Sequence, residues 1–195
     1  MTELILIRHG PTEWNAIGRV QGRTDIPLSE SGRARVRTWR VPEDFAGHES
    51  VASPLKRARE TAELLGRNPL LLEPRLMEMH WGEWEGETLA ALRDRYGEEL
   101  VRNEAQGLDF RAPGGESPRD VQTRLLSWMA ERAALGRPTV AVAHKGVLRA
   151  AYALATGWDM TGEAPDDLGW DCAHIYRLAS DGRPTVVKLN ISLLP

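Results

Sequence analysis

The chain has 195 residues, a formal net charge of -3, and 42% hydrophobic and 27% charged residues. These values predict one globular domain over residues 1–195 and give no reason to expect nucleic acid or an anionic membrane as a partner. No apolar run is long enough to predict a membrane-spanning helix. The N-terminus has no basic-then-apolar leader and the lone cysteine, Cys172, has no partner for an internal disulfide, which favours a cytoplasmic location.

The first part of the chain predicts a strand, a long polar loop and a helix. Residues 3–7 read as a short buried strand that leads into Arg-His-Gly. The loop over residues 8–28 is rich in Gly, Pro, Thr, Asn and Gln, and long loops inside compact domains are usually functional. Ser29 is a predicted N-cap for a helix that extends to about residue 41, where a proline stops it.

The next elements alternate in the same way. Residues 50–52 predict a short strand, and Ser53-Pro54 predict the N-cap and first turn of a helix that ends near residue 66. This helix places Arg57 roughly one turn inside its start. The remaining elements predicted here are a strand over 69–73, an ordered loop over 75–86 and a helix over about 88–104.

The second half predicts a helix, a central strand, another helix and two late strands. Ser117, Pro118 and Asp120 predict a capped helix start, and apolar residues recur at helical spacing behind it. The run over residues 139–143 is typical of a central parallel strand. A helix over 147–156 and strands over about 173–178 and 185–191 complete the chain. Because strands alternate with helices, the fold class is α/β with packed layers.

Two of the predicted strands lead directly into histidines, His9 and His144. In open α/β sheets the ligand crevice lies outside the carboxyl ends of the strands. If these two strands are neighbours, both histidines face the same crevice, and the helix that follows His144 favours an anion there. The alternative is that each histidine is an ordinary strand-end residue that faces solvent or bonds to backbone.

Six motifs follow one another between residue 4 and about residue 151. They are RHG at 8–10 with TEWN and GRVQG behind it, PLSESG at 27–32, SPLKRA at 53–58, GEWEG at 82–86, PGGES at 113–117 and VAHKG at 142–146. In this order they resemble the histidine phosphatase superfamily, which includes the cofactor-dependent phosphoglycerate mutases. The resemblance implies a three-layer αβα sandwich with a mainly parallel, mixed central sheet.

The resemblance also implies roles for individual residues. His9 corresponds to the nucleophile that takes the phosphoryl group as a phosphohistidine. Arg8 and Arg57 correspond to the arginines that clamp the phosphate, and their planar forks suit bidentate contact with phosphate oxygens. His144 corresponds to the second histidine, which holds the transferring group. The positions implied in substrate binding are Asn15, Gln21 and Gly22.

Glu78 aligns with the acid of the family, just before the GEWEG motif. The reaction needs a proton for the leaving alkoxide and then a base for the attacking water, and one carboxyl group can serve in both steps. Glu13, Glu83 and Glu85 are rival candidates. Glutamates on such loops are more often solvated or capping residues, so Glu78 is preferred.

Lys145 stands where most members of the family carry a small residue after the second histidine. Its side chain either adds a cation to the substrate pocket or points outward and leaves only its backbone amide near the phosphate. The second interpretation is preferred, because long side chains at helix starts usually reach solvent. Lys145 is included among the candidate substrate-binding residues.

The interval between the GEWEG and PGGES motifs is short for a phosphoglycerate mutase. It carries four arginines but lacks the longer basic insertion with which mutases retain their intermediate. A shorter lid admits water to the phosphohistidine and favours hydrolysis. The arginines read first as a solvated helix face and second as a substrate-selecting lid.

The predicted function is therefore that of a phosphomonoesterase that acts on a small-molecule phosphate ester through a phosphohistidine. Alternatives are a phosphoglycerate mutase-like phosphotransferase and a regulatory protein that dephosphorylates or binds phosphoprotein. The five histidines show no metal-ligand spacing, so no metal and no cofactor are predicted. The physiological substrate and the oligomeric state stay open.

Overall fold

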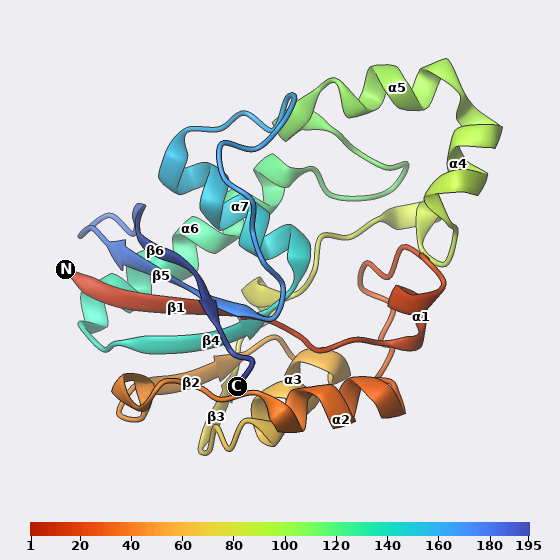
Figure 1. Ribbon diagram of the computed structural model, residues 1–195. Coiled ribbons are helices and arrows are strands. Elements are labelled where there is room, and N and C mark those ends of the chain that lie inside the picture. The colour runs from red at the N-terminus through yellow and green to blue at the C-terminus, as the bar shows by residue number, and fades with distance from the viewer.

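The computed structural model describes residues 1–195, and a six-stranded mixed sheet lies at its centre (Figure 1). The strand order is β3-β2-β4-β1-β5-β6. β1 to β4 run parallel to one another, whereas β5 is antiparallel to both of its neighbours. The strands are β1 (Thr2–Arg8), β2 (Glu49–Ala52), β3 (Leu70–Leu72), β4 (Thr139–Ala143), β5 (Cys172–Leu178) and β6 (Pro184–Ser192).

β1 and β4 are adjacent, which is the condition for His9 and His144 to face the same crevice. They pair in parallel with Arg8 opposite Ala143, and the amide of His9 donates to the carbonyl of Ala143 over 2.9 Å. His9 and His144 therefore leave the sheet at the same edge. The α/β fold with a mainly parallel, mixed sheet is confirmed.

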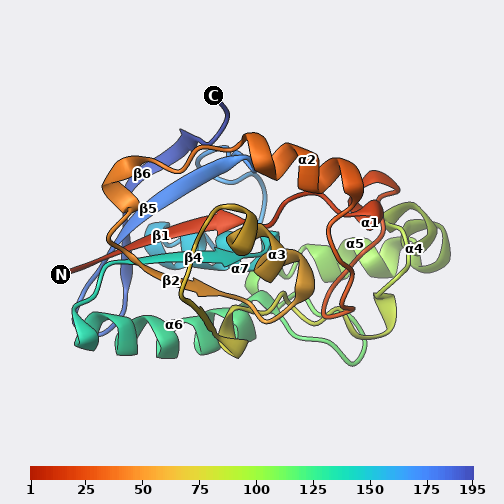
Figure 2. The same ribbon diagram turned by 90° about the horizontal axis from the view of Figure 1, so that it is seen from below.

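Helices cover both faces of the sheet, which gives three layers (Figure 2). β1 contributes to the cores on both sides of the sheet, because side chains alternate between faces along a strand. Leu4 and Leu6 face one helical layer, Ile5 and Ile7 face the other, and all four are fully buried. One layer contains α2 (Glu30–Thr38) and α3 (Lys56–Leu64), and the other contains α6 (Pro118–Leu135) and α7 (Lys145–Thr156).

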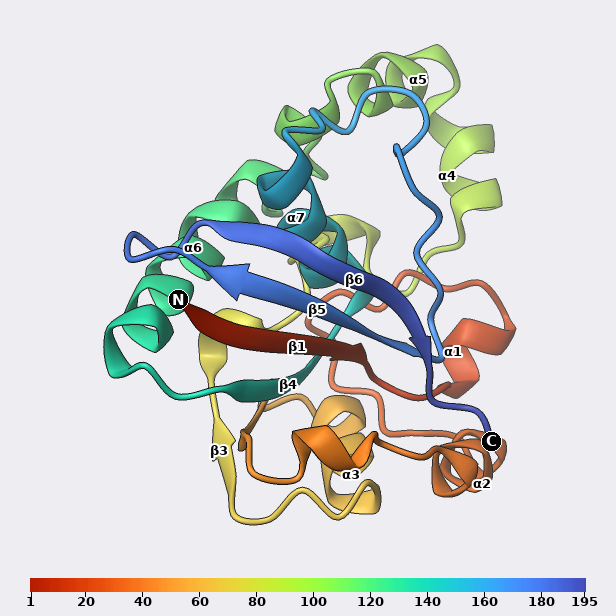
Figure 3. The same cartoon turned by 60° about the vertical axis from the view of Figure 1, so that its left-hand side comes forward.

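A smaller unit of α4 (Leu89–Tyr96) and α5 (Glu98–Glu104) projects from the layers (Figures 1 and 3). The single helix predicted over 88–104 is wrong, because the chain turns at Gly97, where φ is +48°, a conformation that glycine adopts readily. This unit has its own small core of Trp84, Leu92, Leu100 and Ala112. The short helix α1 (Glu13–Ala16) lies in the loop after β1.

Helix starts were predicted with mixed success. The capping box at Ser117 is confirmed, since its hydroxyl accepts from the amide of Asp120 and the Asp120 side chain accepts in return. The predicted N-cap at Ser53 is wrong: α3 begins at Lys56 without a side-chain cap. The Ser53 hydroxyl contacts a histidine ring instead, as described below. No helix combines the length and the apolar character needed to span a membrane.

Candidate active site

A cavity of about 580 Å³ lies outside the carboxyl ends of β1 and β4. Its inner end is polar, and its outer walls combine aromatic and aliphatic side chains with basic ones. The inner lining includes Arg8, His9, Arg57 and Glu78, which the sequence analysis assigned to chemistry. The outer lining includes Trp14, Val20, Trp81, Trp84, Leu89, Leu100, Phe110 and Met160.

His9 is held in one tautomer by the backbone that follows it. Its Nδ1 lies 2.6 Å from the carbonyl oxygen of Gly10. A carbonyl only accepts, so Nδ1 carries the proton and the lone pair is on Nε2. Burial and the charges of Arg8 and Arg57 hold the pKa of His9 well below its usual value of 6.5. The ring is therefore neutral at physiological pH and has a free nucleophilic nitrogen.

His144 lies beside His9, and the two ring centroids are 5.1 Å apart. Its Nε2 lies 2.8 Å from the Ser53 hydroxyl, whereas its Nδ1 is buried without a hydrogen-bond partner. Burial, followed by the charge of Arg57, holds the pKa of His144 well below the usual value. The inner site thus contains two adjacent neutral imidazoles.

The guanidinium of Arg57 is fixed by two backbone carbonyls, and its Nε donor has no partner. It is buried in the first turn of α3, where its terminal nitrogens donate to the carbonyls of Thr24 and Gly22 over 2.9 and 2.7 Å. Its Nε is buried and has no partner. Gly22 itself is buried and lines the cavity, and its carbonyl holds the Arg57 guanidinium.

Arg8 also carries a buried Nε without a partner. Its guanidinium carbon lies 5.2 Å from the centroid of the Trp170 ring. Burial lowers the pKa of Arg8 and the charge of Glu78 opposes this shift. Buried donors in proteins are nearly always satisfied, so the orphaned Nε atoms of Arg8 and Arg57 indicate a site for an anion.

Asn15 and Gln21 lie on the loop after β1, and Thr12 orients both. The Thr12 hydroxyl lies 3.0 Å from the amide oxygen of each side chain, and its one proton serves one of them at a time. The oxygens of Asn15 and Gln21 therefore face Thr12, which leaves their NH₂ groups free as donors. Both residues line the cavity.

Glu78 follows the short 3₁₀ turn η2 (Pro74–Leu76) and is held by backbone amides. Oε1 accepts from the amide of Met79 over 2.9 Å, and Oε2 accepts from the amide of Gly146 over 3.2 Å. The second bond uses one of the free amides in the first turn of α7. A Cβ at Gly146 would lie 2.4 Å from Glu78 Oε1, so only glycine permits this approach without displacing the carboxylate.

Lys145, at the start of α7, is exposed but does not point away from the site. Its side chain lines the cavity, and its ammonium nitrogen lies 5.2 Å from the Trp170 ring centroid. The preferred interpretation of an outward-pointing side chain is therefore wrong. The attraction between the cation and the face of the indole holds the ammonium at the mouth of the pocket.

The comparison with known proteins agrees with this geometry. Residues 4–192 match the model of the histidine phosphatase superfamily, branch 1. The chain belongs to this superfamily. It is 31% identical to phosphoserine phosphatase 1 of Hydrogenobacter thermophilus, over 98% of the chain and 93% of that protein. It is 35% identical to 2,3-bisphosphoglycerate-dependent phosphoglycerate mutase 2 of Gloeobacter violaceus, over 77% of the chain and 74% of that protein.

A solved structure extends the similarity to three dimensions. The complex of a mycobacterial glucosyl-3-phosphoglycerate phosphatase with inorganic phosphate superimposes with a TM-score of 0.78, at 30% identity and over 99% of each chain. The relatives thus include both phosphatases and mutases. The present chain is an enzyme of the histidine phosphatase family, whose members share the phosphohistidine mechanism.

The rival glutamates occupy other places in this histidine phosphatase. Glu13 and Glu83 are exposed. Glu85 accepts from the amides of Arg23, Thr24 and Trp81 and from the Thr24 hydroxyl. Burial opposes ionisation of Glu85, but these hydrogen bonds outweigh it and lower the pKa of the carboxyl. None of the three lines the cavity, so the structure favours Glu78.

Several residues of the histidine phosphatase site were missed by the sequence analysis. Trp170 and Arg149 come from segments outside the assigned site residues, and nothing in their neighbouring sequence marks them. Arg124 donates to the carbonyl of Glu78 over 3.3 Å and pairs with Glu116. Glu116 belongs to the PGGES motif, so that motif was the available signal. No three His, Cys, Asp or Glu side chains are grouped as a metal site.

Proposed function

We propose that this histidine phosphatase is a metal-independent phosphomonoesterase that hydrolyses small phosphate esters through a phosphohistidine on His9. The observation that carries the proposal is the bond from His9 Nδ1 to the Gly10 carbonyl. It leaves Nε2 as a nucleophile next to the unpartnered donors of Arg8 and Arg57. The nucleophile and the two cations therefore lie together at the inner end of the cavity.

In the first step, His9 Nε2 attacks phosphorus and the bond from phosphorus to the ester oxygen breaks. Glu78 supplies the proton that the leaving alkoxide takes up. Arg8 and Arg57 neutralise the phosphoryl oxygens as charge redistributes in the transition state. The alcohol departs and the phosphoryl group is bound to His9.

In the second step, water attacks the phosphohistidine and Glu78 takes the proton of the water. The bond from nitrogen to phosphorus breaks, which returns the electron pair to Nε2 and releases inorganic phosphate. The His144 ring centroid lies 5.1 Å from that of His9, and its buried Nδ1 has no protein partner, so this nitrogen is available to hold the transferring phosphoryl group. Glu78 has then given one proton to the alcohol and recovered one from water, and the enzyme returns to its starting state.

A phosphoglycerate mutase-like phosphotransferase is the second candidate. The observation in its favour is the 35% identity to the Gloeobacter violaceus mutase. The short α4–α5 unit favours hydrolysis, because a shorter lid over the cavity admits water to the phosphohistidine.

A panel of phosphomonoesters, assayed with and without a chelator, tests the proposal. We expect hydrolysis that is unaffected by the chelator and is abolished in His9→Ala. His48→Asn, which changes a histidine far from the cavity, is the matched control and should retain activity. Loss of activity with the chelator would contradict the metal-independent mechanism.

Product analysis with 3-phosphoglycerate and a bisphosphoglycerate primer separates the two candidates. We expect free phosphate and glycerate from a phosphatase. Formation of 2-phosphoglycerate instead would identify a mutase and overturn the proposal.

A further inference from the structure

The cavity carries far more positive charge than the chain as a whole. Its lining contains five cations but only two acids, Glu78 and Glu104, whereas the whole chain has a formal net charge of -3. Glu104 lies 3.7 Å from an arginine outside the cavity. The lining cations are Arg8, Arg19, Arg57, Lys145 and Arg149.

Four of these cations share one kind of support. The charged side-chain groups of Arg8, Arg19, Lys145 and Arg149 make no hydrogen bond or ion pair, and each lies 4.7 to 5.8 Å from the centroid of a tryptophan ring. These are all of the cation–π pairs in the protein. An indole face attracts a cation without occupying the N–H donors of the cation. The tryptophans therefore hold the four basic side chains in place and leave their N–H donors free.

Lys145 and Arg149 form a pair within this set. They are four residues apart on α7, so they lie on the same helix face. Lys145 contacts Trp170, which it shares with Arg8, and Arg149 contacts Trp158 at 4.7 Å. A row of three cations therefore runs from the phosphate-binding end along α7.

The mutual repulsion of these three cations is unfavourable as long as no anion lies among them. Lys145 keeps contact with solvent, but its partial desolvation lowers its pKa, and the nearby charges of Arg8 and Arg149 lower it further. Burial also lowers the pKa of Arg149. Like charges that are partly removed from water repel one another, and a bound anion would reverse that cost.

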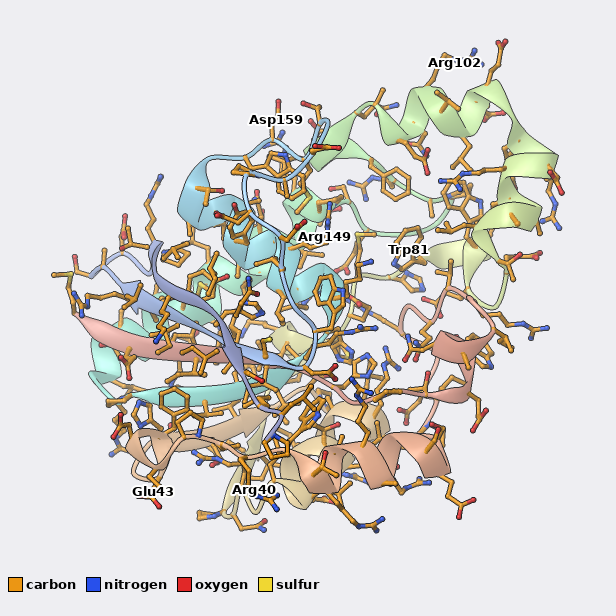
Figure 4. The ribbon with its side chains drawn as sticks, viewed as in Figure 1. Arg40, Glu43, Trp81, Arg102, Arg149 and Asp159 are labelled. Atoms are coloured by element: carbon orange, nitrogen blue, oxygen red, sulfur yellow. The ribbon has the colours of Figure 1, made fainter.

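We infer that Lys145 and Arg149 form a second anion subsite, and that the substrate is a phosphomonoester whose leaving group carries a further carboxylate or phosphate. Arg8 and Arg57 hold the scissile phosphoryl group, and the second anion lies beyond it along α7. Figure 4 shows Arg149 on α7 and Trp81 across from it on the loop after η2. The wall of Trp81, Leu89 and Phe110 lacks charge, so it directs the second anion toward α7. This inference rests on the proposed phosphatase function.

Matched ester pairs test the subsite. Phosphoethanolamine lacks the carboxylate of phosphoserine, and glycerol 3-phosphate has a hydroxymethyl group in place of the carboxylate of 3-phosphoglycerate. A bisphosphate ester adds a second phosphate. We expect kcat/KM to favour the ester with the second anion. In Lys145→Gln and in Arg149→Gln, this preference should fall by about 10-fold or more, through KM, as expected for the loss of a charge-assisted hydrogen bond.

Lys188→Gln is the control for net charge, because Lys188 is an exposed lysine on β6 far from the cavity. It should leave both the activity and the preference unchanged. An equal loss for both members of each ester pair in Lys145→Gln and Arg149→Gln would overturn the subsite, because it would indicate non-specific attraction only. A preference for the esters without the second anion would also overturn it.

A binding measurement separates this inference from the proposed function. Calorimetry compares 3-phosphonopropionate with propylphosphonate, which are non-hydrolysable and differ by one carboxylate. We expect tighter binding of 3-phosphonopropionate, and we expect Lys145→Gln and Arg149→Gln to remove the difference. Absence of hydrolysis with this binding difference intact would overturn only the phosphatase, whereas hydrolysis without any preference or binding difference would overturn only the subsite.

Discussion

The inner end of the cavity and the α4–α5 unit are built in different ways. At the inner end, each functional side chain is tied to another element: His144 to Ser53 after β2, Arg57 to the loop after β1, and Glu78 to the start of α7. The α4–α5 unit packs around its own small core instead. This difference indicates that the catalytic side chains are fixed by the sheet and its adjoining helices, whereas part of the cavity wall opposite α7 belongs to a unit with its own core.

Glu78→Gln gives the largest effect that we predict for the inner end. The amide keeps the shape of the carboxyl but neither donates a proton to the alkoxide nor takes one from water. We expect kcat to fall by about 10²–10⁴-fold, with phosphate binding intact. With p-nitrophenyl phosphate, whose leaving group needs no proton, only the second step is impaired, and phosphohistidine on His9 should accumulate in rapid-quench mass spectrometry. Glu83→Gln, at an exposed position of the same loop, is the control. If Glu83→Gln showed this loss instead, the assignment of Glu78 would be wrong.

Gly146→Ala tests whether the link between Glu78 and α7 matters. The new Cβ would lie 2.4 Å from Glu78 Oε1, so the carboxylate has to move out of its place. A shift of about 1 Å in a catalytic group can cost about 10²-fold in rate, and we expect a fall in kcat of about 10- to 10²-fold. Gly47→Ala is the control, because no atom lies within 4 Å of its added Cβ. Equal activity of the two variants would show that the approach of Gly146 has no catalytic value.

The two regions also differ in how far the sequence predicts them. The inner end was predictable because its residues follow predicted strands or lie in ordered motifs, as with His9 and His144. The contacts of Lys145 with Trp170 and of Arg149 with Trp158 were not predictable. A cation–π contact between α7 and a loop depends on tertiary packing that no local pattern encodes. The orientation of Lys145 was misjudged for the same reason. The break at Gly97 was missed because polar residues continue the helical pattern on both sides of it.

Acidification should affect the inner end through its buried histidines. The pKa of His9 and of His144 lies well below 6.5 in the folded protein, whereas it is about 6.5 in the unfolded chain. Below pH 6.5 the unfolded chain therefore binds protons that the folded protein does not, and the free energy of unfolding falls. We expect each histidine to contribute about 1.4 kcal/mol per pH unit in that range.

Urea unfolding between about pH 7.5 and 5.5 measures this slope. His9→Ala removes one of the two groups, so its slope should be smaller than that of the unchanged protein. Equal slopes in both proteins would show that His9 takes up its proton at the same pH whether folded or unfolded, and that burial does not keep its ring neutral.

Leu92→Ala gives the smallest predicted effect on activity and tests the independence of the α4–α5 unit. Leu92 is fully buried in the small core but does not line the cavity. Its truncation should cost about 2–5 kcal/mol of local stability, which hydrogen exchange would detect as faster exchange over residues 89–104. We expect KM for esters with bulky leaving groups to rise a few-fold, with the affinity for inorganic phosphate unchanged.

Leu125→Ala is the matched control, since Leu125 is equally buried but lies in the main core under β1. It should lower the thermal midpoint of the whole protein and speed exchange in the sheet. If Leu92→Ala instead destabilised the sheet as much as Leu125→Ala and weakened phosphate binding, the two regions would unfold together. The α4–α5 unit would then be a structural support of the catalytic end, and substrate selection could not change there without a cost to the chemistry.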